Sequence, residues 1–168
     1  MNGVNDVVFK SRFSKWIAGM YWIILAVLLI MMIGIPLTIP MNVIVKILFI
    51  SVNDCIAIMF VYLIWKGYTM KFIISKNQII IYGLIRKINI VIFDVESIKK
   101  IPILFGVRLF GAQFLGGLYY FPEIGNASVT MSNFDDAVLI TTKQKKNYII
   151  TPQNPQDFIN TVMKIKNE

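Results

Sequence analysis

The stretch WIAGMYWIILAVLLIMMIGIPLTIPMNVIVKILFISVNDCIAIMFVYLIW, residues 16–65, decides the fold of this 168-residue chain. Its first 30 residues contain no charged side chain. The apolar run is interrupted once, at residues 36–42, where two prolines favour a turn. An apolar helix of 20 residues is about 30 Å long, which matches the hydrocarbon core of a bilayer. The stretch therefore predicts two transmembrane helices, at about 16–36 and 43–65.

Small residues recur about every seven positions on the first predicted helix, at Gly19, Ala26 and the pair Ile33-Gly34. Small side chains let two membrane helices approach closely. We therefore expect this stripe to pack against a second-helix face that includes Ser51 and Cys55.

Cationic side chains flank the hairpin on one side. Three precede the first helix and three follow the second: Lys10, Arg12, Lys15, Lys66, Lys71 and Lys76. The turn contains none before Lys46, at its edge. Because cytoplasmic flanks carry the excess of Lys and Arg, both termini are expected in the cytoplasm. A cleaved signal peptide does not fit, because a second span follows and no Ala-x-Ala-like site is present.

Asp54, with Asn53 beside it, lies near the middle of the second apolar segment. A carboxylate at that depth costs roughly 2.5–3.5 kcal/mol on insertion scales. Residues 26–33 of the first segment are wholly apolar and offer no partner. Two interpretations stay open: a protonated Asp54 bonded to Asn53 or a backbone carbonyl, or an intramembrane contact with a second copy or another membrane protein. Two helices enclose no channel, which argues against an ion pathway.

The chain from Lys66 onward is basic and has room for one small domain. It carries 13 basic and 7 acidic side chains, and the formal charge of the whole chain is +8. The mean hydropathy of +0.67 reflects the apolar first 65 residues. Beside a bilayer, the basic surplus is explained either by anionic lipid headgroups or by solvation of a small domain. No nucleic-acid partner is predicted.

The sequence contains no histidine, and its single cysteine, Cys55, lies in the second apolar segment. This composition excludes disulfides within the chain, Cys/His zinc sites and Ser-His-Asp or Cys-His catalysis. Asp135 and Asp136 stand together without other clustered carboxylates, so they are interpreted as a turn. We predict no catalytic residue, metal ligand or cofactor.

After Gly67 the apolar pattern becomes alternating, which predicts strands. They are expected at about 69–75, 79–82, 85–92, 94–101, 127–132, 137–142 and 147–151. Asn154 and Pro155 then favour a helix start, and Phe158, Val162 and Ile165 form one apolar stripe over 155–166. The predicted fold class is α+β: a two-helix transmembrane hairpin followed by an antiparallel β-barrel or sandwich with a C-terminal capping helix.

The second half of the chain resembles the bacterial pleckstrin-homology-like (PH-like) domains of small membrane proteins. The matching segments are Arg108-Leu-Phe-Gly111, Gly116-Gly117, Phe121, Gly125, Val138-x-Ile140-x-Thr142, Tyr148-Ile-Ile-Thr-Pro152 and Asn154-Pro-Gln-Asp-Phe-Ile159. The resemblance covers roughly the last 100 residues, and its motifs are turns and core positions. It implies a seven-stranded barrel capped by a C-terminal helix, with no catalytic residues.

Residues 104–121 mix aromatic side chains with glycines and suit no nucleotide loop, because no Walker motif or helix follows. One interpretation is an irregular connection over a barrel edge, with glycines in its bends. The other is an apolar surface that enters the bilayer or receives a partner. In that case Phe110 and Phe114 make the contact, with Arg108 at the headgroups.

Lys143, Lys145 and Lys146 form the basic tip of the last predicted hairpin. A solvated turn needs no further function. Alternatively, the three lysines dock the domain on anionic lipid.

The predicted organisation is a cytoplasmic segment at 1–15, a hairpin at 16–66 and a cytoplasmic PH-like domain at 67–168. We expect a multi-pass protein of the bacterial plasma membrane that serves as a non-enzymatic interaction or scaffold module. Its partners are the bilayer, anionic headgroups, a membrane or cytoplasmic protein, or a second copy. Immunity against a membrane-active peptide is the alternative function, and a membrane-embedded enzyme or transport accessory subunit is more distant.

Overall fold

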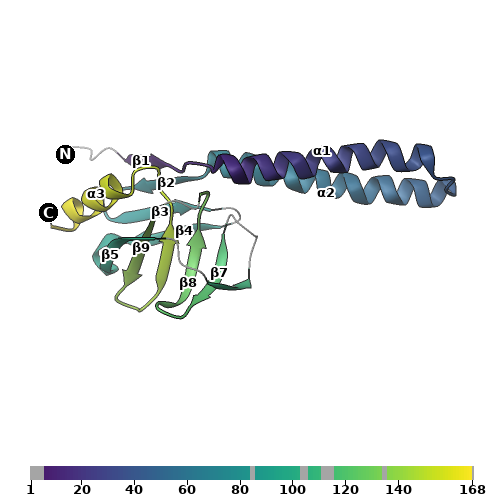
Figure 1. The fold of residues 1–168 in the computed structure, drawn as a ribbon. Helices are drawn as coiled ribbons and strands as arrows, with labels where there is room; N and C mark the ends of the chain where they lie inside the picture. Colours follow the sequence, from purple (N-terminus) through teal and green to yellow (C-terminus); the bar gives the residue numbers. More distant parts are fainter. Residues whose placement is uncertain (1–5, 84–85, 103–105, 111–115, 134–135, 168) are drawn as a thin grey trace. The chain divides into compact units, whose positions relative to one another are not determined.

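A computed structural model describes residues 6–83, 86–102, 106–110, 116–133 and 136–167 (Figure 1). The chain divides into two compact units. One unit is helical and comprises Lys15–Lys66, while the other combines the residues on both sides of it. The fold is α+β, as predicted.

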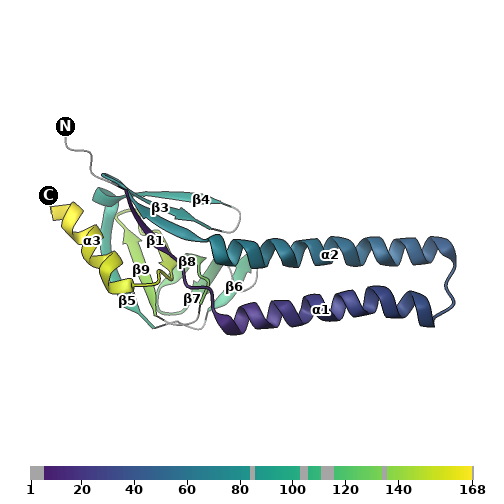
Figure 2. The ribbon, with the colours of Figure 1, turned by 90° about the horizontal axis from the view of Figure 1, so that it is seen from above.

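The helical unit consists of α1 (Lys15–Thr38) and α2 (Val43–Thr69), which run side by side (Figure 2). Both are long and apolar enough to be candidate membrane spans. Pro36 falls in the last turn of α1, and the side chain of Asn42 caps α2 by accepting a 3.0 Å hydrogen bond from the amide of Ile44. The predicted hairpin is therefore present, with each helix extending slightly past its predicted ends.

The contact between α1 and α2 differs from the predicted seam. Ser51 and Cys55 are exposed, whereas Asn53, Ala57 and Ile64 are buried. Aromatic rings meet across the pair, where Tyr21 and Phe60 pack edge to face with centroids 5.6 Å apart. The predicted seam was wrong, because Ala26, Ser51 and Cys55 are exposed and a different set of residues, with Tyr21 and Leu25 beside Ala18 and Ala57, is buried.

The second unit contains ten described strands and two helical segments. The strands are β1 (Val7–Lys10), β2 (Lys71–Ile74), β3 (Gln78–Tyr82), β4 (Lys87–Val91), β5 (Val95–Ile101), β6 (Val107–Phe110), β7 (Gly117–Phe121), β8 (Gly125–Thr130), β9 (Ala137–Thr142) and β10 (Asn147–Ile150). A 3-10 turn, η1 (Ile92–Asp94), precedes β5, and α3 (Pro155–Asn167) ends the fold. The C-terminal helix is thus confirmed.

These strands form two sheets that are not closed into a barrel. The order is β1-β2-β3-β4 in one sheet and β5-β9-β10-β8-β7-β6 in the other. No described strand pair joins the two sheets, so the sandwich interpretation holds and the barrel prediction was wrong. The larger sheet is mixed, because β8 and β10 run parallel.

Strand β1 was not predicted, and it pairs antiparallel with β2. The strand precedes α1 and its partner follows α2, so the helical pair is inserted between two neighbouring strands of one sheet. Phe9 of β1 packs edge to face on Phe158 of α3, with ring centroids 5.2 Å apart. The N-terminal segment therefore contributes both a strand and a core contact to the β-rich unit.

The larger sheet is covered on both faces along β9. Val138 and Ile140 face a core shared with the smaller sheet and with Phe158 and Val162 of α3. Leu139, between them, faces a second cluster on the opposite side of the sheet. Since neighbouring residues of a strand point to opposite faces, burial on both sides accounts for the unbroken apolar run from Ala137 to Ile140 in β9.

Candidate functional site

The segment that leads into α1 is held by polar groups of the β-rich unit. The hydroxyl of Ser11 lies against that of Ser132 and donates to the carbonyl of Thr151 at 2.9 Å. Ser132 and Asn133 both donate side-chain hydrogen bonds of 3.1 Å to the carbonyl of Arg12. We call Ser11, Arg12, Ser132, Asn133 and Thr151 the polar seam. It fixes the chain immediately before the first helix begins.

The segment that returns from α2 reaches the same place. A Cβ atom on Gly67 would lie 2.7 Å from the ring of Phe13, so any other residue here would require this ring to move. The ring of Tyr68 packs edge to face on Phe13, with centroids 5.0 Å apart. The two connections to the helical pair therefore lie side by side.

A row of lysines crosses the end of the smaller sheet, where the chain connects to the helices. Strand register aligns Lys10, Lys71, Tyr82 and Lys87 on β1 to β4 in turn. The ammonium groups of Lys71 and Lys87 lie 5.1 and 5.5 Å from the centroid of the Tyr82 ring. We call these four residues the lysine row.

An apolar surface lies at the β6 edge of the larger sheet. A bulge at Leu109 brings Val107 and Phe110 to one face, where they pair with Tyr120 and Leu118 of β7. All of these side chains are exposed, Phe110 to 81% and Val107 to 66%. Contiguous exposed apolar groups on an edge strand are typical of a contact surface.

The family is decided by a comparison with known protein families. The sequence model described as "Bacterial PH domain" matches residues 70–165, more than half of the chain. This chain belongs to the bacterial PH domain family. No curated protein and no solved structure matches the chain in the corresponding comparisons.

Two of the predicted contact residues in the PH domain lie on β6. Phe110 belongs to the exposed apolar surface, while Arg108 pairs with Tyr119 of β7 on the other face. Burial raises the pKa of the Tyr119 phenol, and the positive charge of Arg108 opposes this shift. Phe114, the third predicted residue, lies outside the described residues. The geometry therefore brings Phe110 together with β7 and turns Arg108 away from it.

The three lysines of the β9–β10 tip have partners of different kinds. The ammonium group of Lys145 binds both oxygens of Glu96 at 3.0 Å. The backbone amide of Lys143 donates a 2.8 Å hydrogen bond to the carbonyl of Asp94. The tip lies at the opposite end of β10 from Thr151 in the polar seam, and lipid contact there stays a prediction.

Asp54 and Asn53 of α2 occupy different environments. Asn53 is buried and donates a 2.8 Å hydrogen bond to the carbonyl of Phe49, one turn earlier. Asp54 and Cys55 are exposed on the surface of the helical pair. The hydrogen bond of Asn53 is thus made with its own helix, while the Asp54 carboxyl faces outward.

The acidic residues of the described PH domain do not converge. Asp136 forms an ion pair with Lys100 at 2.5 Å, and its predicted turn partner Asp135 lies outside the described residues. Within the part of the chain that the structure describes, no three His, Cys, Asp or Glu side chains are grouped as metal ligands would be.

The polar seam and the lysine row are absent from the sequence-based predictions. Both depend on β1, a four-residue strand whose partner lies beyond the helical insertion. The only signal was the short β-branched and aromatic run Val7-Val8-Phe9.

Proposed function

We propose that this chain is a non-enzymatic interaction module of the bacterial plasma membrane. In this proposal α1 and α2 cross the bilayer, and the PH domain lies in the cytoplasm with both termini. The length and apolar surface of the helices support the spans, and the flanking lysines and arginines support the orientation.

The observation that carries the proposal is the insertion of the helical pair between β1 and β2. Both connections are pinned, one by the polar seam and the other by the packing of Phe13 on Gly67 and Tyr68. A single flexible linker would let the PH domain sample a wider range of distances from the membrane. Because both ends of the helical pair continue directly into the PH domain, helices that span the bilayer tether the domain to the membrane at two points.

The partner surface in this proposal is the edge formed by β6 and β7. An extended segment of a protein partner adds beside β6, the last strand of the larger sheet among the described residues, with main-chain hydrogen bonds to that strand. Val107, Phe110, Leu118 and Tyr120 then bury their exposed apolar groups.

Cysteine labelling of intact cells tests the orientation. In a Cys55→Ser background, Asn42→Cys is expected to react with a membrane-impermeant maleimide added outside. Lys143→Cys is expected to react only after the cells are permeabilised. Outside labelling of Lys143→Cys in intact cells contradicts the proposed topology.

Site-specific photocrosslinking in cells tests the partner surface. A photoreactive amino acid at Phe110 is expected to form a discrete adduct with another protein. The matched control is Phe93 of η1, which is also an exposed aromatic residue of the PH domain. Equal adducts at both positions, or none at Phe110, overturn the assignment of this surface.

A further inference from the structure

The lysine row concentrates positive charge where like charges are costly. Lys10 and Lys71 stand directly opposite each other on neighbouring strands, and Lys87 is two strands farther along the same row. Directly opposed like charges destabilise a sheet. The row therefore has an energetic cost that a bound anion removes.

The tyrosine in the row organises the lysines without neutralising them. Lys71 and Lys87 approach the Tyr82 ring from neighbouring strands, at distances typical of cation–π contacts. These contacts hold the two ammonium groups near one ring. The ring carries no net charge, so the positive field of the row remains.

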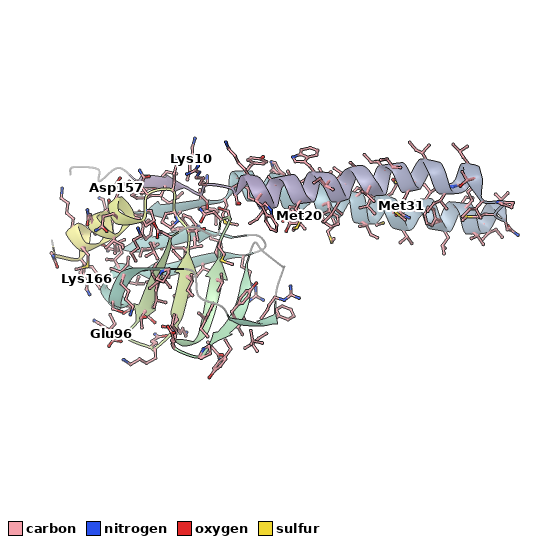
Figure 3. All side chains as sticks on the ribbon, viewed as in Figure 1. Lys10, Met20, Met31, Glu96, Asp157 and Lys166 are labelled. Atoms are coloured by element: carbon pink, nitrogen blue, oxygen red, sulfur yellow. The ribbon has the colours of Figure 1, made fainter. Side chains whose placement is uncertain are left out.

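No ion pair among the described residues neutralises the lysine row. Among the described residues, the ion pairs found are Lys100–Asp136 and Lys145–Glu96, and neither includes the row. Figure 3 shows Lys10 pointing outward from β1, on a different sheet from Glu96. The described acidic side chains thus leave the row available to an external anion.

The position of the row along the chain selects the anion. Lys71 follows the last residue of α2, Thr69, by two residues, which span at most about 7 Å. A short segment separates Lys10 from the start of α1, and the polar seam holds this segment in place. If α2 crosses the bilayer, its end keeps the row among lipid headgroups at high effective concentration.

We propose that Lys10, Lys71 and Lys87, arranged around Tyr82, bind the phosphate groups of anionic phospholipids in the membrane that carries this chain. This site rests on the proposed membrane insertion, and it lies away from the β9–β10 tip. It makes the PH domain sense headgroup charge directly beside its own anchor.

Lipid retention by the full chain tests this site. The protein is extracted in a mild detergent containing equal amounts of phosphatidylglycerol and phosphatidylcholine, and native mass spectrometry counts the lipids that remain bound. The natural chain is expected to retain phosphatidylglycerol preferentially. Replacing the row by Lys10→Gln, Lys71→Gln and Lys87→Gln is expected to lower this preference roughly fivefold for each lysine that contacts a phosphate.

The matched control removes the same charge from the tip, with Lys143→Gln, Lys145→Gln and Lys146→Gln. It is expected to keep the preference of the natural chain. Arginine at all three row positions is also expected to keep it, which separates charge from folding effects. Loss in the tip variant with retention in the row variant overturns the proposal.

A further arm separates lipid from free phosphate. Millimolar inorganic phosphate is expected to leave phosphatidylglycerol bound, and complete displacement overturns the lipid assignment. Unchanged retention in the row variant, together with the expected cysteine labelling, overturns this inference but leaves the proposed membrane topology standing.

Discussion

Gly67 is a residue where the absence of a side chain makes room for a neighbouring ring. A helical Gly→Ala change usually stabilises by up to about 1 kcal/mol. Here the added Cβ meets the Phe13 ring at 2.7 Å, and such overpacking costs about 1–3 kcal/mol. Gly67→Ala is therefore expected to lower the Tm of the purified protein in detergent.

Gly19→Ala is the matched control for Gly67→Ala. A Cβ atom at Gly19 meets no heavy atom within 4 Å, so this variant is expected to leave the Tm unchanged or to raise it. A higher Tm for both variants contradicts the close packing of Phe13 on Gly67.

Tyr119 predicts a dependence of stability on pH. Burial raises its pKa above the ordinary value of 10.0, and Arg108 opposes the shift. Its contribution is therefore fully present below pH 10 and is lost as the pH rises through the raised pKa. The free energy of unfolding, measured by circular dichroism, is expected to fall in this pH window. Tyr119→Phe is expected to remove the part of this fall that is due to ionisation of the phenol. The same change at Tyr120 serves as control; equal effects contradict the assignment.

Asp54 predicts an association between copies within the membrane. Its exposed carboxyl lies in an apolar helix, where contact with lipid tails is costly. Contact with a polar group of a second copy offsets part of this cost. A thiol-specific crosslinker in native membranes is expected to join two chains through Cys55, which is also exposed. Asp54→Leu is expected to weaken the dimer band, and Cys55→Ser to abolish it. A dimer band of unchanged strength in Asp54→Leu rejects the role of the carboxyl.

At the scale of elements, the polar seam ties β1 and the start of α1 to the ends of β8 and β10. Ser132 is fully buried, and its hydroxyl lies against that of Ser11 and donates to the carbonyl of Arg12. Removing that hydroxyl takes one of two side-chain donors from the part-buried carbonyl of Arg12, at a cost of about 1 kcal/mol. Ser132→Ala is therefore expected to loosen the segment before α1 and to accelerate tryptic cleavage after Arg12.

Ser128→Ala is the control for the seam. Ser128 lies on β8, and its side chain is only partly buried. Cleavage after Arg12 is expected to match that of the natural chain. Equal acceleration in both variants contradicts a specific role for the seam.

The strands that were predicted and those that were missed differ in burial. The β9–β10 hairpin was predicted because its apolar side chains fill the core. Strand β6 was missed because all four of its residues are exposed, so no buried face imposes an alternating pattern. Strand β7 begins with a glycine and mixes exposed with buried aromatics, which resembles an irregular connection.

At the scale of the whole molecule, the PH domain is completed by chain from both sides of the helical pair. Residues 67–168 alone lack β1, which leaves the edge of β2 without its partner strand and removes the contact of Phe9 with Phe158. Joining Ser14 to Gly67 through a short Gly-Ser linker in place of residues 15–66 preserves all ten strands. This version is expected to be monomeric with a higher Tm than the 67–168 fragment, measured by light scattering and thermal unfolding. Equal stability contradicts the contribution of β1.

The sequence by itself determined the helical pair, most core strands, the C-terminal helix and the family resemblance. Those features depend on apolar runs, alternation and capping residues, which act over a few neighbouring positions. Only the tertiary structure decided the open pair of sheets, the parallel β8–β10 contact and the addition of β1. It also decided the lysine row, because strand register across the helical insertion brings Lys10 beside Lys71. Such pairings form between segments that are far apart in the sequence, and local patterns do not predict which distant segments will pair.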